Sequence, residues 1–319
     1  MTRTLLSAFL CLLVSAGTAM VIEIPAGELD NLSTLVVTGT VTGLSSRWSD
    51  DQSGIYTDVT LAVEQVEKGL ADNSIVVRVP GGEVGDVGLA VEDVPVFSVG
   101  DRVRLHLAPA PGGGYSLVSF RQGAQPVEDG KPLAYYKWSG YKRSPANCHY
   151  RINSSLPADW PAAIQAGAGT WSAAGSAFRF YYDGTTSASG VTYDGINCVS
   201  RGSLGAGGTI AQNSYWYNRK TKIVSENDIV FNTYYSWTTV GTPGCFDVQN
   251  IGTHEQGHCL VLDDIYQSYQ SEMTMYGYGA TDETKKRTLE FGDINGIKKI
   301  YGAGFFAPNP QVQPKATLD

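Results

Sequence analysis

The sequence predicts an α+β protein in which a small all-β domain, a barrel or a sandwich, precedes a larger domain of strands and helices. The chain of 319 residues, 42% hydrophobic and 17% charged, is long and apolar enough to bury a core. Residues 20–130 consist of short alternating runs typical of strands. Residues 131–306 mix strand-like runs with amphipathic segments, without a regular strand–helix–strand alternation.

The first 19 residues have the pattern of a secretory signal peptide. Arg3 precedes an apolar run from Leu5 to Val14, and small residues, the last of them Ala19, stand where signal peptidase reads. We therefore expect cleavage after Ala19 and a secreted, extracellular protein. The apolar run is too short to span a bilayer, so we expect no stable membrane anchor.

The charge of the chain argues against two classes of partner. The formal net charge is -8, the pI is near 5.0, and no run of five basic residues occurs. A nucleic-acid-binding or anionic-membrane-binding surface needs clustered positive charge. We therefore expect neither partner, and we expect the protein to be a monomer.

Residues 20–130 are predicted to form the all-β domain. Five runs have strand character, and Gly and Pro residues separate them: 34–44, 55–66, 74–80, 101–109 and 115–120. His106 lies within the fourth run at strand spacing and is interpreted as an ordinary strand residue. A polar stretch with Pro and Gly places the domain boundary near Glu128–Lys131.

The larger domain, residues 131–306, is predicted to combine strands with three helices, and residues 307–319 form a tail. Trp160, Ile164 and Trp171 recur at helical spacing in a segment from Pro157 to Gly175. A second helix spans the motif described below, and the last spans 290–302. Strands are predicted at 147–153, 177–184, 207–218 and 227–232.

The motif "IGTHEQGHCLVLDD", from Ile251 to Asp264, contains two of the four histidines of the chain. His254 and His258 are four residues apart and therefore share one face of a helix, as two ligands of a zinc ion do. Glu255 lies about 100° further around the helix, where its carboxylate can reach a water bound to the metal. Zinc lowers the pKa of such a water toward about 7, and the glutamate can accept its proton during attack on a carbonyl.

Three segments resemble the matrixin-like metzincins, a family of zinc metalloproteases. They are "HEQGHCLVLDD", the Met-turn-like "SEMTMYG" and "GDINGIKKIYG", and the resemblance covers roughly residues 136–302. It implies a metzincin-like catalytic domain with a twisted mixed sheet, an active-site helix and a C-terminal helix. It also implies a zinc endopeptidase, with peptides or proteins as substrates and one catalytic zinc ion. The implied site residues are the ligands His254, His258 and Asp264, the general base Glu255, Met275 beneath the metal, and Tyr276 and Tyr278 beside the substrate pocket.

Two departures from that family pattern concern the third ligand. Val261 stands where the pattern has a glycine, and because a β-branched residue resists positive φ, we expect the turn to differ or to begin later. The ligand at the final position is an aspartate instead of a histidine. The open alternatives to Asp264 are Asp263 and an acid of the final helix, Glu290 or Asp293, although Asp293 also suits a helix cap.

Four cysteines remain after signal removal, which in an exported chain suggests two disulfides. We expect Cys148 to pair with Cys198 and Cys245 with Cys259; the alternative is four buried free thiols.

The stretch "GAGGTIAQ" is predicted to be an edge strand to which a substrate peptide adds by main-chain pairing, through Gly208, Thr209, Ile210 and Ala211. An ordinary edge strand is an equal alternative. Calcium is possible at Asp183 or Asp194, which are also common turn residues. Residues 201–216 contain no histidine, so no second zinc is expected.

The sequence therefore predicts a secreted zinc metalloendopeptidase. The alternatives are a secreted binding or adhesion protein that retains an inactive peptidase fold, and a zinc hydrolase of non-peptide amides. Residues 20–130 contain no cysteine, so a cysteine that silences the zinc from a propeptide is not available there. The first domain could block the cleft, bind a surface, or assist folding.

Overall fold

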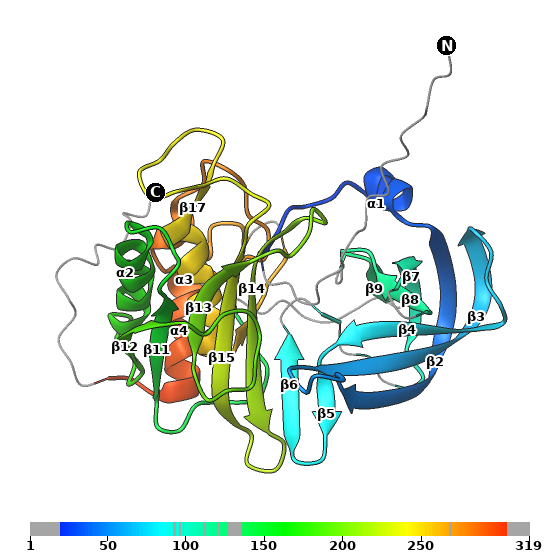
Figure 1. Cartoon of the computed structure of the whole chain (residues 1–319), viewed down its shortest axis with the longest axis horizontal. Helices are drawn as coiled ribbons and strands as arrows, with labels where there is room; N and C mark the ends of the chain where they lie inside the picture. The colour runs from blue at the N-terminus through cyan, green and yellow to red at the C-terminus, as the bar shows by residue number, and fades with distance from the viewer. Residues whose placement is uncertain are drawn as a thin grey trace.

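A computed structural model describes residues 20–91, 94, 95, 97, 99–110, 113–119, 122–126, 136–267 and 270–304. The predicted signal peptide, the predicted boundary near 128–131 and the predicted tail lie outside these residues. The residues that the structure describes are 17% helix and 42% strand. A barrel stands beside a larger sheet that carries the long helices (Figure 1). The predicted α+β class is confirmed.

The first half of the chain, residues 20–126, contains a closed barrel. Of the two predicted forms of this domain, the barrel is confirmed and the sandwich is not. Its strands follow the order β2-β3-β4-β8-β7, and β7 pairs back with β2. The bounds are β2 (Leu35–Trp48), β3 (Ile55–Lys68), β4 (Ser74–Pro80), β7 (Arg102–Pro109) and β8 (Tyr115–Leu117), with β9 (Ala124–Pro126) added on β7. Inward-facing Val and Leu side chains fill the barrel. The helix α1 (Ala26–Leu32) supplies Asp30, whose carboxylate lies 2.8 Å from Nε2 of the buried His106.

The second half is built on an eight-stranded sheet of order β12-β11-β13-β15-β14-β6-β5. Neighbours from β12 to β15 run parallel, and β14 and β6 run antiparallel to their neighbours. The bounds are β12 (Arg179–Thr186), β11 (Asn147–Asn153), β13 (Cys198–Gly202), β15 (Ile223–Asn232), β14 (Thr209–Asn218), β6 (Val87–Val91) and β5 (Gly82–Val84). The eighth strand, β1 (Met20–Val21), pairs with β14. Short pairs complete the fold: β10 (Lys137–Trp138) with β18 (Leu262–Asp263), and β16 (Trp237–Thr238) with β17 (Phe246–Asp247).

The two predicted ranges, residues 20–130 and 131–306, share this sheet. The hairpin β5–β6 leaves the barrel half and pairs with β14, and β1 does the same at the other end of β14. This hairpin lies in a Gly-rich stretch between two of the predicted runs, and its strands, of three and five residues, were not predicted. Trp48 of the barrel also stacks on Trp216 of β14, with ring centroids 5.7 Å apart.

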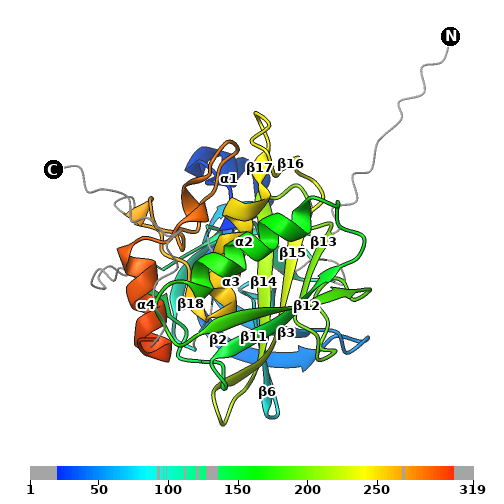
Figure 2. The ribbon, with the colours of Figure 1, turned by 90° about the vertical axis from the view of Figure 1, so that its left-hand side faces the viewer.

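Helices cover one face of the sheet (Figures 1 and 2). The bounds are α2 (Trp160–Ser172), α3 (Val248–Cys259) and α4 (Phe291–Tyr301), with a short 3-10 turn at Lys285–Arg287. The three predicted helices are confirmed, with narrower ends. Trp171 Nε1 donates to the Thr253 carbonyl at 2.6 Å, and a Cβ at Gly167 would lie 2.6 Å from Gln256 Oε1. This close approach of α2 fixes the position of α3.

Asp228 in β15 gives the fold a pH dependence. Its side chain is 1% exposed, and burial raises its pKa to about 8. The native state therefore keeps a proton that the unfolded chain, with a pKa near 3.8, has released, so the stability from this group is lost as the pH rises toward 8. We expect the free energy of unfolding to fall by about 1.5–2 kcal/mol between pH 6.5 and 8. Denaturant titrations of the parent and of Asp228→Asn, in which this dependence should vanish, test the prediction.

Candidate metal centre

The helix α3 begins at a defined N-cap. Asp247 is the N-cap residue, and its Oδ1 accepts from the Asn250 amide at 2.8 Å. Arg287 Nε donates to the same carboxylate at 2.9 Å. From this start the helix places His254 and His258 on one buried face, and both side chains are 0% exposed. The sequence alone predicted this shared face.

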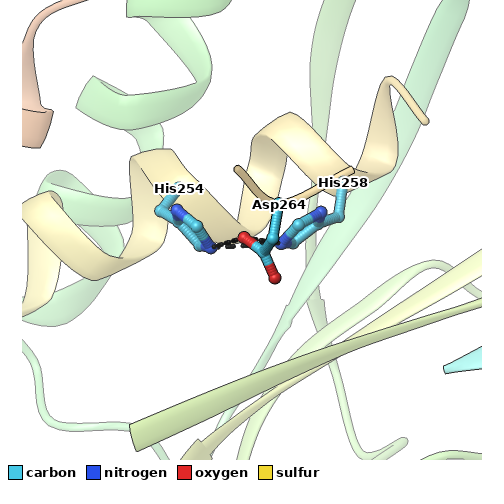
Figure 3. Close-up of side chains that lie close together, drawn as sticks. All are labelled: His254, His258 and Asp264. Atoms are coloured by element: carbon cyan, nitrogen blue, oxygen red, sulfur yellow. Dashed lines mark hydrogen bonds and ion pairs between the residues drawn. The ribbon is translucent and has the colours of Figure 1, made fainter. Parts of the chain in front are cut away.

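Asp264 completes a cluster of three possible ligands (Figure 3). The two Nε2 atoms lie 3.1 Å apart. Asp264 Oδ1 lies 3.1 Å from His254 Nε2 and 3.6 Å from His258 Nε2. Each residue offers one ligand atom, and all three atoms lie within 4.8 Å of one another. Within the part of the chain that the structure describes, this is the only such group of His, Cys, Asp or Glu.

The hydrogen-bond partners of the two Nδ1 atoms show which nitrogen of each imidazole carries a proton. His254 Nδ1 donates to the Thr274 carbonyl at 2.7 Å, and His258 Nδ1 donates to the Leu262 carbonyl at 2.8 Å. Burial lowers the pKa of His258 to about 4, so its ring is neutral at pH 7. Because Nδ1 donates in both rings, both Nε2 atoms are left facing the Asp264 carboxylate. A cation bound to these three atoms stabilises such an arrangement.

The spacing of the donor atoms fits zinc. Two nitrogens bound tetrahedrally at about 2.0–2.1 Å from zinc lie about 3.3 Å apart. The observed separation of the Nε2 atoms is 3.1 Å. Two imidazoles and one carboxylate are also a ligand set that catalytic zinc sites use. The hydrogen bonds to Thr274 and Leu262 orient both rings, as the outer partners of zinc ligands do.

The three other acids considered as the third ligand are engaged elsewhere. Asp263 pairs with Lys137, Nζ to Oδ2 3.3 Å. Glu290 is the N-cap residue of α4, and Asp293 forms the capping box with it. Asp293 also accepts from the backbone amides of Thr274 at 2.9 Å and Met275 at 3.1 Å. Asp293 therefore both caps a helix and holds the carbonyl-bearing segment that orients His254.

The chain turns after α3 at Val261, where the sequence predicted a different or later turn; that expectation was wrong. Val261 adopts φ +63°, and its amide donates to the His258 carbonyl at 2.9 Å. The side chain is fully buried with Tyr215, Tyr217 and Val224. Packing of this side chain offsets the cost of a left-handed backbone, which is about 1–2 kcal/mol for a residue with a Cβ.

Because Val261 has a positive φ, we expect the usual order of stability of alanine and glycine variants to be reversed at this position. Val261→Ala and Val261→Gly remove nearly the same buried surface, but only glycine relaxes at positive φ. We expect the glycine variant to be more stable than the alanine variant by about 1 kcal/mol. Urea titration of both variants measures this difference. The turn assignment fails if alanine is the more stable of the two.

Met275 lies against α3. The residue is 1% exposed, and a Cβ at Gly257 would lie 2.2 Å from its Sδ. Gly257 stands between Glu255 and His258 in the motif, so the absence of a side chain there lets Met275 pack under the histidine-bearing turns. Tyr276 follows in the segment beside the site, and Lys286 Nζ lies 5.9 Å from its ring centroid.

Glu255 is completely buried on the same helix. Asn213 of β14 donates from Nδ2 to the Glu255 carbonyl at 2.8 Å, and Asn213 Oδ1 accepts from Asn227 at 2.9 Å. Sequence reasoning missed Asn213, since an asparagine inside a strand gives no signal of what it faces. A cavity of about 690 Å³ between the two halves reaches Asp264, and its lining includes Lys137, Trp138, Tyr215, Glu83 and Leu89.

Residues 208–211 were predicted to be an edge strand, and this is corrected because β1 covers them; that a substrate can pair there stays a prediction. Thr209, Ile210 and Ala211 are 5%, 0% and 0% exposed, and β1 pairs with this part of β14. Gly208 has φ +93°, and its carbonyl accepts from the Ile22 amide at 2.9 Å. The sequence could not indicate this cover, because a two-residue strand has no periodicity.

The predicted disulfide pairs are also corrected, since all four cysteines are free. The twelve-residue helix α3, about 18 Å long, separates Cys245 from Cys259, whereas a disulfide joins Cα atoms at most about 6.8 Å apart. Cys198 pairs in register with Arg151, three residues beyond Cys148 and so about 10 Å along the strand. The thiol of Cys148 instead contacts that of Cys259.

The two calcium candidates have other contacts. Asp183 Oδ2 lies 3.1 Å from His149 Nδ1. Asp194 Oδ1 accepts from the Ile196 amide at 2.9 Å, as turn residues do.

Among the described residues, no helix is both long and apolar enough to cross a membrane. No protein-family model and no curated protein matches the chain.

Proposed function

We propose that this protein is a zinc-dependent endopeptidase, exported through its signal peptide, that hydrolyses peptide bonds in proteins or peptides. The convergence of His254 Nε2, His258 Nε2 and Asp264 Oδ1 beside a buried Glu255 carries the proposal. Three acceptors within 4.8 Å support a cation site, and the adjacent glutamate supports hydrolysis.

His254, His258 and Asp264 would hold the zinc ion. Zinc in such a site supplies Lewis acidity and lowers the pKa of a water ligand toward about 7. The Glu255 carboxylate accepts a proton from the water that adds to the peptide carbonyl, and then donates it to the leaving amine nitrogen. The burial of Glu255 keeps this proton exchange away from bulk solvent. The Thr274 and Leu262 carbonyls hold both imidazoles with Nε2 toward the ligand position.

Removal and return of the metal test this function. We expect the secreted chain to bind one zinc ion, to cleave a quenched peptide and a denatured protein, to lose cleavage to a chelator and to regain it with zinc. Zinc at 1,000 times its Kd should also stabilise the fold by about 4 kcal/mol, read as a shift in thermal unfolding. A chain that binds no zinc contradicts the proposal. A chain that binds one zinc ion but does not cleave, even when β1 (Met20–Val21) is displaced, favours the alternative of an inactive binding protein.

A further inference from the structure

The strand β1 lies between two walls of the second half. On one side Met20 pairs with Ala211 and Val21 with Thr209, antiparallel to β14. On the other side Val21 bridges in parallel to Tyr278. The Val21 amide donates to the Gly277 carbonyl at 3.1 Å, and the Gly279 amide donates to the Val21 carbonyl at 3.1 Å. The segment is thus bound through its main chain on both sides.

The side chain of Met20 is held as deeply as a core residue. Met20 is 0% exposed and belongs to the same apolar cluster as Ile210 and Met275. A Cβ at Gly279 would lie 2.3 Å from Met20 Sδ, so the thioether packs directly on this glycine. We call the space bounded by residues 208–211 and 277–279, in which β1 lies, the β1 groove.

Both walls of the β1 groove also hold parts of the metal centre. Asn213, two residues beyond the partner of Met20, donates to the Glu255 carbonyl at 2.8 Å. Thr274, on the segment that continues into the other wall, accepts from His254 Nδ1. Met20 is the end of β1 nearer to Asn213, and the chain runs away from the metal centre through Val21 and Ile22.

The barrel half holds the far end of this segment. Gln122 Nε2 donates to the Ile22 carbonyl at 3.1 Å, and Gln122 Oε1 accepts from the Ile24 amide at 2.9 Å. The hairpin strand β6 pairs with the rest of β14, from Ser214 to Asn218. Two segments of the first half therefore cover the β14 side of the metal centre.

We propose that Met20–Ile22 is an intramolecular occupant of the peptide groove, bound as an added strand in the place of a substrate, so that the protein is self-inhibited until this segment leaves. The inference rests on the proposed function, because it takes the groove beside Glu255 as the peptide site. Main-chain pairing supplies binding, and the buried methionine fills a side-chain pocket. A tethered segment competes at an effective concentration in the millimolar range, so a free peptide binds weakly while it is in place.

Binding of a labelled peptide tests this without requiring hydrolysis. The probe is a fluorescein-labelled Met-Val-Ile-Glu-Ile, the sequence of residues 20–24, and the proteins are full secreted chains carrying Glu255→Gln. Val21→Pro removes the donor to Gly277 and should tighten the Kd at least about tenfold. Gln122→Ala loosens the far end from outside the groove and should tighten it about three- to tenfold.

Gln125→Ala is the matched control, an exposed glutamine on β9 three residues from Gln122, and its Kd should equal that of the parent. Equal affinities in all four proteins, or no binding in any of them, overturn the proposal. Gln122→Ala keeps the test valid if Val21→Pro does not fold.

Hydrogen exchange on the unsubstituted chain gives an independent result. Saturating peptide should displace β1, so the amides of Val21 and Ile22 lose protection while the Gly279 amide, which then bonds to the peptide, keeps it. Bound peptide that leaves Val21 and Ile22 protected contradicts displacement.

Hydrolysis by the same chains with Glu255 intact separates the two proposals. A tighter Kd in Val21→Pro together with a rise in kcat/KM of at least about tenfold supports both. Tighter binding without cleavage by any chain supports the peptide groove and contradicts the peptidase activity. Cleavage at equal rates, with equal peptide affinities, supports the peptidase activity and contradicts the self-inhibition.

Discussion

Replacing Glu255 with glutamine is expected to lower kcat/KM for peptide hydrolysis by about 10²–10⁴-fold, the usual contribution of a general base. Glutamine has nearly the same size as glutamate but cannot accept the proton from the attacking water. Glu255 is fully buried, and it does not belong to the cluster of three possible zinc ligands. Zinc content should therefore stay at one ion per chain, and peptide affinity should be unchanged.

The measurement compares initial rates on a quenched peptide, in whichever of the parent and Val21→Pro backgrounds cleaves faster. Zinc stoichiometry and thermal unfolding are recorded on the same samples. Glu272→Gln is the control, because Glu272 is an exposed glutamate that pairs with Lys285 at 3.3 Å, and it should leave the rate unchanged. A Glu255→Gln chain with full activity contradicts the assigned base.

Replacing Asp264 with asparagine is expected to weaken zinc binding by more than about 100-fold. Outer partners of zinc ligands already contribute about 10–100-fold to affinity, and a direct ligand contributes more. Asparagine keeps the shape of the side chain but removes the negative charge that faces two imidazole nitrogens at 3.1 and 3.6 Å. Competition with a zinc-sensitive dye measures the dissociation constant.

Asp263→Asn is a matched control in the adjacent position. Asp263 pairs with Lys137, whose side chain is 53% exposed, and such pairs contribute little. We expect its zinc affinity to stay within about threefold of the parent. If Asp263→Asn loses zinc and Asp264→Asn retains it, the third ligand has been assigned to the wrong residue.

Periodicity predicted the helices and most strands, because each of these is long enough to repeat its pattern. The helix through His254 and His258 follows from spacing alone, and so does their shared face. The barrel strands 35–48 and 55–68 were equally readable from alternating residues. The short elements were not predicted. The strands β1, β5 and β6 contain two, three and five residues, which is too few for an alternating pattern to be recognised.

The errors near the site have the same kind of cause. Val261 was expected to avoid positive φ, since local sterics oppose it, yet burial against Tyr215 and Tyr217 outweighs that cost. The expected disulfide pairs do not form, because the length of α3 and the strand register decide which thiols meet. Predictions from local sequence fail at such positions because contacts between residues distant in sequence contribute more to the free energy of folding than local preferences do.

The sequence by itself determined the α+β class, the barrel strands, and the helical placement of His254, Glu255 and His258, because these depend on spacing along the chain. Only the tertiary structure decided that Asp264 faces both histidines, that Asp293 holds the Met275 segment, and that β1 pairs with residues 209–211 of β14. Each of these depends on residues far apart in sequence meeting in space, and no local pattern encodes that meeting.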